Sequence, residues 1–174
     1  MPKHLIITII SDDKPGIVKT LADTVARFQG NWLESRLAHL AGKFAGVIRI
    51  AVEEAEMSRL KQALEQLREV GMQLQIEASE ERQPTSTNNS ASFSALGPDR
   101  PGIVKEISQA FAEYQINVEE LNTHCSSMPY SGEPLFEAEG RILAPPGTDL
   151  DKLHAQLDAI ADALAIDIRL QTSS

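Results

Sequence analysis

A repeated seven-residue motif constrains the fold of this chain more than any other feature. Residues 13–19 read Asp-Lys-Pro-Gly-Ile-Val-Lys and residues 99–105 read Asp-Arg-Pro-Gly-Ile-Val-Lys, so six of seven positions are identical at an offset of 86. The correspondence continues beyond the motif, and the offset grows to 92 where Phe44 meets Phe136. This period indicates a duplicated small domain, because solenoid repeats are shorter and need at least three copies.

Both copies show the same order of hydrophobic periodicities. In the first copy they predict a strand at 3–10, a helix from Val18 to Phe28, strands at 31–40 and 43–53, a helix that Gly71 ends and a strand from Met72 to Ala78. In the second copy they predict a helix from Val104 to Tyr114, strands at 117–127 and 134–144, a helix with Thr148 as N-cap and a strand from Ile166 to Leu170. The order βαββαβ, twice, predicts an α+β fold class: two ferredoxin-like domains, each a four-stranded antiparallel sheet with two helices on one face.

The predicted domains are residues 1–79 and 91–174, joined by a linker at 80–90 that has no large apolar residue. The first strand is apolar on both sides, which is typical of a strand with both faces covered. On the second strand, alternation places Trp32 on the same face as Glu34 and Arg36. Because domains of about 80 residues are marginal alone, we expect the copies to pack on each other or on a second chain, with a homodimer favoured.

Charge and cysteine content exclude several classes of protein. The formal net charge is −9, with 16 Lys+Arg against 25 Asp+Glu, and most of the excess acidity lies in the second half. Phosphate backbones and anionic membranes need clustered basic residues, so direct binding to nucleic acid or to a membrane is not expected. The lone Cys125 rules out an internal disulfide, and residues 5–10 are too few for a signal-peptide core. We therefore expect a soluble, cytoplasmic protein.

The Asp-x-Pro-Gly segments have a composition suited to a ligand site. Each joins the first strand of a copy to its first helix, where proline suits the first helical turn and glycine permits close approach to the backbone. The open N–H groups of a helix start can hold a carboxylate, and Asp or Asn oxygens can accept from an ammonium. A zwitterionic amino acid fits this pattern. A single segment of this kind is more often a purely structural turn, and its recurrence at the same point narrows that difference. Asn31 and Asn117 open the following strands near the far end of each helix, so their approach to the loop depends on how two domains pair.

No catalytic site, metal site or cofactor is predicted. The four histidines lie on four different predicted elements, and His124 and Cys125 are strand neighbours that point to opposite faces. Two rivals share the predicted topology. An RNA-recognition module needs stacking aromatics and a basic sheet, whereas aromatic residues are 5% of this chain. A small ferredoxin-like hydrolase needs a clustered nucleophile, and none is visible.

The duplicated Asp-x-Pro-Gly-Ile-Val motif and the Asn that opens the next strand resemble the ACT domain, a regulatory module that binds amino acids. The segment Met128-Pro129-Tyr130-Ser131-Gly132, ahead of Pro-Leu-Phe-Glu-Ala, resembles more narrowly the tandem-ACT family of glycine cleavage system transcriptional repressors. The resemblance implies ligand-binding residues at Asp13, Gly16, Ile17, Val18 and Asn31, and at Asp99, Gly102, Ile103, Val104 and Asn117. Trp32 corresponds to Val118, so the two sites are not expected to be identical.

That resemblance implies a non-catalytic sensor of glycine, or of a related small amino acid, that represses the glycine cleavage operon through a LysR-type activator protein. The alternative is an ACT-type module that regulates a metabolic enzyme. Glycine has five non-hydrogen atoms, and a ceiling of about 1.5 kcal/mol per atom limits its binding free energy to roughly 7.5 kcal/mol. We therefore expect dissociation constants between micromolar and millimolar.

Overall fold

The computed structural model describes residues 1–79 and 89–172, which form two compact units on either side of the division between Gln83 and Pro84. Most of the predicted linker lies outside the described residues. Asn89 and Ser90, which the sequence analysis assigned to the linker, are instead the first two residues of a strand. We describe each unit by itself.

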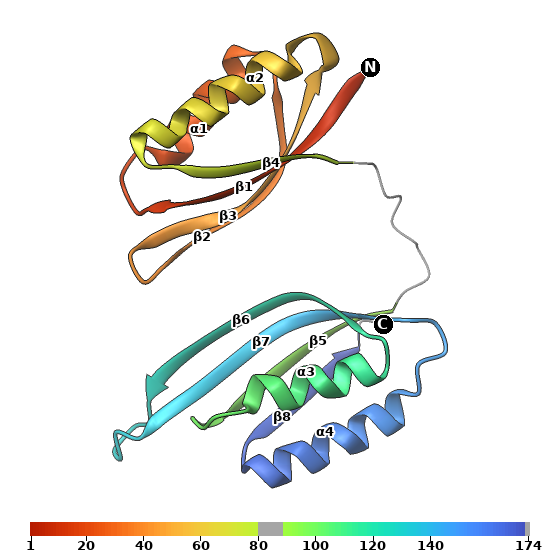
Figure 1. Ribbon diagram of the computed structural model, residues 1–174. Helices are drawn as coiled ribbons and strands as arrows, with labels where there is room; N and C mark the ends of the chain where they lie inside the picture. The colour runs from red at the N-terminus through yellow and green to blue at the C-terminus, as the bar shows by residue number, and fades with distance from the viewer. Residues whose placement is uncertain (80–88, 173–174) are drawn as a thin grey trace. The chain divides into compact units, whose positions relative to one another are not determined.

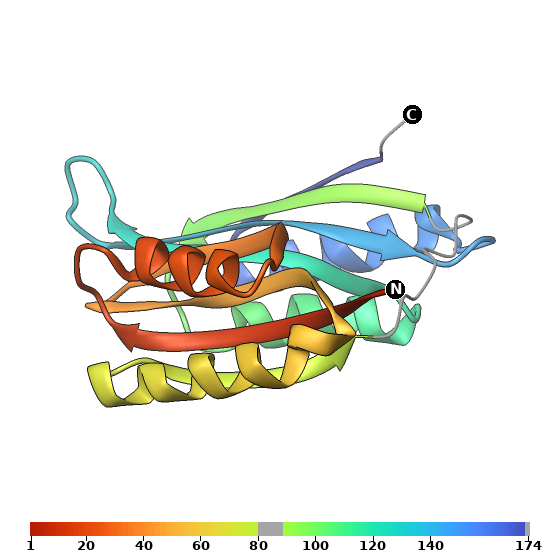
Figure 2. The ribbon, with the colours of Figure 1, turned by 90° about the horizontal axis from the view of Figure 1, so that it is seen from above.

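The first unit is a four-stranded antiparallel sheet with both helices on one face (Figure 1). Its elements are β1 (Pro2–Asp12), α1 (Ile17–Arg27), β2 (Asn31–Leu40), β3 (Lys43–Glu53), α2 (Glu54–Gln66), the short 3₁₀ helix η1 (Leu67–Val70) and β4 (Gln73–Ser79). The strand order is β2-β3-β1-β4. In Figure 2, α1 and α2 extend along β1, one on each side of it.

The second unit repeats this arrangement, with the order β6-β7-β5-β8. Its elements are β5 (Asn89–Pro98), α3 (Ile103–Glu113), β6 (Asn117–Ser127), β7 (Pro134–Ala144), α4 (Leu150–Leu164) and β8 (Asp167–Thr172). Figure 1 shows α3 and α4 on the same face of their sheet. The predicted fold class, α+β with the βαββαβ order twice, is confirmed.

Each unit has its own hydrophobic core between the sheet and the helices. In the first unit, Leu5 and Ile7 of β1 are fully buried under Leu21 of α1 and Leu60 of α2. In the second, the rings of Phe93 and Phe111 meet edge to face, with centroids 5.1 Å apart, an arrangement that aromatic pairs prefer. The opposite face of β1 is less covered, and Ile10 is 45% exposed. The expected covering of this face by another domain or chain stays a prediction.

Two local expectations were wrong. The N-cap of α4 is Asp149, whose carboxylate accepts a hydrogen bond from the Lys152 amide at 3.1 Å. The predicted cap, Thr148, instead donates its hydroxyl to the Pro145 carbonyl at 2.7 Å. Trp32 does not share a face with Glu34, because the β2–β3 register shifts between these two residues. Trp32 therefore packs against the first core.

The strand pairing places the end of β1 beside two other chain segments. Asp12 pairs with Lys43 at the β2–β3 hairpin, and Ile10 pairs with Gln73 at the start of β4. The loop from β1 to α1 therefore lies between that hairpin and the turn that carries Gly71. The end of β1, this loop with the start of α1, and the turn with Gly71 build the candidate site.

Candidate functional site

The start of α1 is shaped by glycine. Gly16 is the N-cap residue and has a φ of 88°, a left-handed conformation that glycine adopts readily and most other residues avoid. The first helical hydrogen bond runs from the Thr20 amide to the Gly16 carbonyl, at 2.9 Å. The preceding amides of the first turn have no acceptor within the helix. Among the described residues, no side-chain cap forms a hydrogen bond with these amides.

A hollow of about 200 Å³ lies at this corner of the first unit. Its walls come from the end of β1, the start of α1 and the turn before β4: Ser11, Asp12, Lys14, Pro15, Gly16, Ile17, Thr20, Val70, Gly71 and Met72. One water needs roughly 10–15 Å³ of such space, so a molecule of five non-hydrogen atoms has room. The Lys14 ammonium lies near Gly71, 3.9 Å from where a Cβ would stand.

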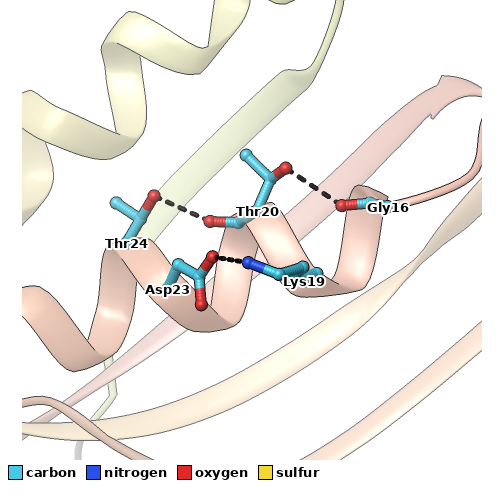
Figure 3. A network of polar contacts seen from close by, with 5 residues as sticks. All are labelled: Gly16, Lys19, Thr20, Asp23 and Thr24. Carbon is cyan, nitrogen blue, oxygen red and sulfur yellow. Dashed lines mark hydrogen bonds and ion pairs between the residues drawn. The ribbon is translucent and has the colours of Figure 1, made fainter.

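The first two turns of α1 are tied together by side-chain hydrogen bonds, which Figure 3 shows from close by. The Thr20 hydroxyl donates to the Gly16 carbonyl at 2.9 Å, and the Thr24 hydroxyl donates to the Thr20 carbonyl at 2.8 Å. Lys19 pairs with Asp23 one turn further along the helix, at 2.5 Å. The lining hydroxyl of Thr20 is therefore held against the helix, and no acidic residue occupies the first turn.

The charged side chains at this corner, Asp12, Asp13 and Lys14, have different partners. The Lys43 ammonium hydrogen-bonds the Asp12 carboxylate and lowers its pKa, and Lys14 lowers the pKa of Asp12 further through its charge. Asp13 turns toward the hairpin instead: its amide donates to the Gly42 carbonyl at 3.0 Å, and its carboxylate lies 3.5 Å from Nε2 of His39. The hollow is therefore lined by positive charge from the Lys14 ammonium and the start of α1, and by the carboxylate of Asp12.

The structure brings together only part of the predicted ligand set in the first unit. Gly16 and Ile17 line the hollow, whereas Asp13 faces the hairpin and Val18 points outward with 45% exposure. Asn31 pairs with Ala51, which pairs with His4 near the other end of β1. At about 3.3 Å per strand residue, Asn31 is roughly 26 Å from the β1–α1 corner, so the two do not meet within one unit.

The second unit places its predicted residues in the same way. Gly102 caps α3 with a φ of 97°, Ile103 is buried and Val104 is 43% exposed. The Asp99 amide donates to the Pro134 carbonyl at 2.9 Å. Asn117 pairs with Leu143, again at the end of the sheet away from the loop.

Sequence reasoning missed several lining residues of the hollow. Ser11 and Asp12 directly precede the motif, and Thr20 stands one helical turn after Gly16, so a wider window around the motif would have included them. Gly71 and Met72 come from the opposite end of the first domain. The strand order of the predicted topology, which pairs the first strand with the last, was the available signal for those two.

A wider hollow of about 390 Å³ lies on the second sheet, where β5, β6, β7 and β8 supply lining residues that include His124, Glu137 and Arg169, but none of its lining residues lies at a helix start. Within residues 1–79 and 89–172, no three His, Cys, Asp or Glu side chains are placed to hold a metal ion. Cys125 is exposed, and Nε2 of its neighbour His124 lies 2.6 Å from a Glu137 carboxylate oxygen. Among the described helices, none is long and apolar enough to cross a membrane.

Comparison with known families identifies the fold. Residues 3–77 and residues 92–128 each match the ACT domain, and together the matches cover more than half of the chain. The chain therefore belongs to the ACT-domain family. It is a regulatory protein with two ACT domains in tandem, as the resemblance in the sequence implied.

Solved structures agree with this fold over the whole chain. A crystal structure of an unknown protein from Galdieria sulphuraria is 22% identical with a TM-score of 0.85, and the match covers 100% of both chains. A crystal structure named "putative glycine cleavage system transcriptional repressor" is 20% identical with a TM-score of 0.69, and the match covers 100% of this chain and 99% of that one. No curated protein matches the sequence.

Proposed function

We propose that this protein is a non-catalytic sensor of a small amino acid, with glycine favoured, and that the ligand binds in the hollow at the start of α1. The amides of the first turn and the Lys14 ammonium suit a carboxylate. The Asp12 carboxylate and the Ser11 hydroxyl, on the wall formed by β1, can accept from an ammonium. The observation that carries the proposal is the juxtaposition of this open helix start with a hollow large enough for glycine.

The proposed output is repression of the glycine cleavage operon through a protein partner, a LysR-type activator, rather than through DNA. The name of the structurally similar repressor supports this output. The net charge of −9 also supports it, since it disfavours binding to a phosphate backbone. Glycine can switch the protein only if it binds two states with different affinity, so the partner must distinguish the liganded from the unliganded protein.

The binding step is tested by titrating the ¹⁵N-labelled full chain with glycine and following amide signals by NMR. We expect saturable shifts at Gly16 and Ile17 with a dissociation constant between micromolar and millimolar. Acetate and methylamine, which each carry one half of the zwitterion, should bind more weakly. Absence of saturable shifts with glycine and with the other nineteen amino acids would refute the proposal.

Variants locate the ligand. Lys14→Gln should weaken glycine binding by roughly tenfold, since one charge-assisted contact is lost. Its matched control, Lys3→Gln at the exposed start of β1, should leave binding unchanged. Asn31→Ala and Asn117→Ala should have little effect if the hollow alone holds the ligand. Loss of binding in Asn31→Ala would instead indicate a site completed by a second copy.

The partner step is tested by capture of a purified LysR-type activator on the immobilised chain, with and without saturating glycine. We expect the captured amount to change with glycine and to be insensitive to competing DNA. Glycine binding without any capture of the activator would contradict the proposed output and leave the enzyme-regulating alternative.

A further inference from the structure

Because of the duplication, each unit has an equivalent corner where its first strand meets its first helix, at the start of α1 and at the start of α3. The residues that line these two corners differ. At the offset of 86, Ser11 corresponds to Gly97, Lys14 to Arg100 and Thr20 to Glu106. On the last strands, Ile9 pairs with Leu74 and Ala95 pairs with Ile168. This pairing makes Met72 and Ile166 equivalent. All four differences fall on residues that line the hollow in the first unit.

In the second unit, the side chain of Ile166 packs against the backbone of Gly97 at the end of β5. A Cβ built on Gly97 would lie 2.5 Å from Cγ2 of Ile166 and 2.8 Å from its Cβ. The branched side chain of Ile166 therefore rests directly on the Gly97 backbone. In the first unit the equivalent strand position carries Ser11, and Met72 stands beside it as part of the wall of the hollow.

The helix starts also differ in charge. The first turn of α3 contains Glu106, whereas the first turn of α1 has no acidic residue and Thr20 stands at the matching position. An acidic side chain in the first helical turn interacts favourably with the helix dipole. The negative charge of Glu106 at the start of α3 therefore disfavours a bound carboxylate there.

The basic residue of the second corner is engaged elsewhere. Arg100 Nη1 donates to the Leu164 carbonyl at the end of α4, at 3.4 Å. Lys14, at the matching position, lies among the residues that line the first hollow. At the start of α3, Ile166 thus covers the Gly97 backbone, and the first helical turn is acidic. The Arg100 guanidinium is hydrogen-bonded within the chain.

We propose that the amino acid binds only at the start of α1, so that each chain binds one ligand. The equivalent corner at the start of α3 has a purely structural role. This inference rests on the proposed function, because it presumes that an amino acid binds. The duplicated Asp-x-Pro-Gly motif then has two roles in one chain: ligand binding in the first unit and helix initiation in the second.

A reciprocal exchange of the first-turn residues tests the inference with glycine as the probe. Thr20→Glu places the acidic residue of α3 in α1. We expect it to weaken glycine binding at least tenfold while α1 stays folded, because an acidic residue in the first turn favours the helix. Glu106→Thr, the matched control, should leave the affinity unchanged. Calorimetry should give one glycine per chain in the wild type and in Glu106→Thr.

The amide signals of the wild type give a second readout that does not depend on any variant. Glycine should shift Gly16 and Ile17 and leave Gly102 and Ile103 in place. Two glycines per chain, shifts at Gly102, or equal losses in the two variants would overturn the one-site inference while leaving the proposed function intact. No glycine binding in the wild type would overturn both.

Discussion

At the scale of single residues, the corner at the start of α1 depends on which groups its charges face. Asp12 and Asp13 are adjacent, yet the structure gives them different neighbours. Asp13 lies against His39 and the hairpin backbone, and Asp12 lines the hollow while bonded to Lys43. Asp12 is the last residue of β1 and Asp13 is the first residue of the loop to α1, so the two carboxylates stand on different parts of the backbone. The carboxylate that reaches the hollow is the one outside the repeated motif.

The pairing of Asp12 with Lys43 predicts a measurable shift. In the wild type the pKa of Asp12 lies below its ordinary value because the Lys43 ammonium donates to the charged carboxylate. Lys43→Gln should raise that pKa toward the ordinary value of about 3.9. The measurement is a pH titration of the Asp12 carboxyl signal by NMR. Lys19→Gln, which removes a different exposed lysine partnered with Asp23, should leave Asp12 unchanged.

The direction of the shift also fixes its effect on stability. A depressed carboxyl pKa contributes stability that is present above the unfolded value and is lost as the pH falls through the folded value. The contribution of the Asp12–Lys43 pair should therefore be constant between about pH 5 and about pH 9, where the carboxylate and the ammonium are both charged. A stability difference between wild type and Lys43→Gln that changes between pH 6 and 8 would require another titrating group.

At the scale of elements, the two units end their second helical segment with the same backbone conformation and different residues. Gly71 closes η1 with a φ of 91°, and Ala165 closes α4 with a φ of 55°. Both conformations are left-handed, which glycine adopts without the steric penalty that a Cβ brings. The second unit therefore carries a strain that the first avoids.

Ala165→Gly should stabilise the second unit by about 1 kcal/mol, because the left-handed penalty for a residue with a Cβ is of that order. For a domain of this size that corresponds to a rise in melting temperature of roughly 4–8 °C. Thermal unfolding followed by circular dichroism measures it. Gly71→Ala is the reciprocal control and should lower the stability of the first unit. A loss of stability in Ala165→Gly would show that the methyl group contributes more through packing than it costs through strain.

The elements were predictable from sequence because each has a clear periodicity and the second copy confirms the first. The two local errors have separate causes. Thr148 and Asp149 can both cap a helix. Because the Thr148 hydroxyl donates a hydrogen bond to the Pro145 carbonyl, Asp149 caps α4 instead. The face of Trp32 was misassigned because a register shift breaks strict alternation, and alternation alone does not reveal a bulge.

The candidate site was predictable only in part, for a reason of topology. The motif located Gly16 and Ile17, but Gly71 and Met72 come from the turn before β4 and reach the hollow through the pairing of β4 with β1. Asn31, although it is part of the family pattern, lies at the other end of the sheet. Local patterns identify the helix start, while the walls of a hollow depend on contacts between distant segments.

At the scale of the whole molecule, duplication followed by divergence explains why the two halves match in fold and differ in surface. The Pro-Gly helix start occurs in both units with nearly the same φ. The residues around it have diverged in sequence: Thr20 corresponds to Glu106, and Ser11 corresponds to Gly97. The charge follows the same division, because nearly all of the net negative charge of the chain lies in its second half. We expect ligand binding in the first unit and attraction of a basic partner surface by the second.

This division of roles predicts a salt-dependent and unit-specific association with the proposed activator. Asp158 and Asp162 are exposed on α4, and Glu54 and Glu65 are exposed on α2. The double variant Asp158→Asn/Asp162→Asn should lower the association rate several-fold at low salt, because acidic patches steer basic partners. The matched double variant Glu54→Gln/Glu65→Gln should change the rate far less, although it removes the same number of charges.

The measurement is the association rate of the purified activator with immobilised protein at ionic strengths from about 0.05 to 0.5 M, where the screening length falls from above 10 Å to below 5 Å. The difference between the two double variants should shrink as salt rises, while the dissociation rate changes little. Equal effects of the two double variants would assign the steering to the net charge of the chain as a whole. A salt-independent association rate would exclude electrostatic attraction and leave an apolar interface, for which the partly exposed faces of β1 around Ile10 and of β5 around Leu96 are two available surfaces.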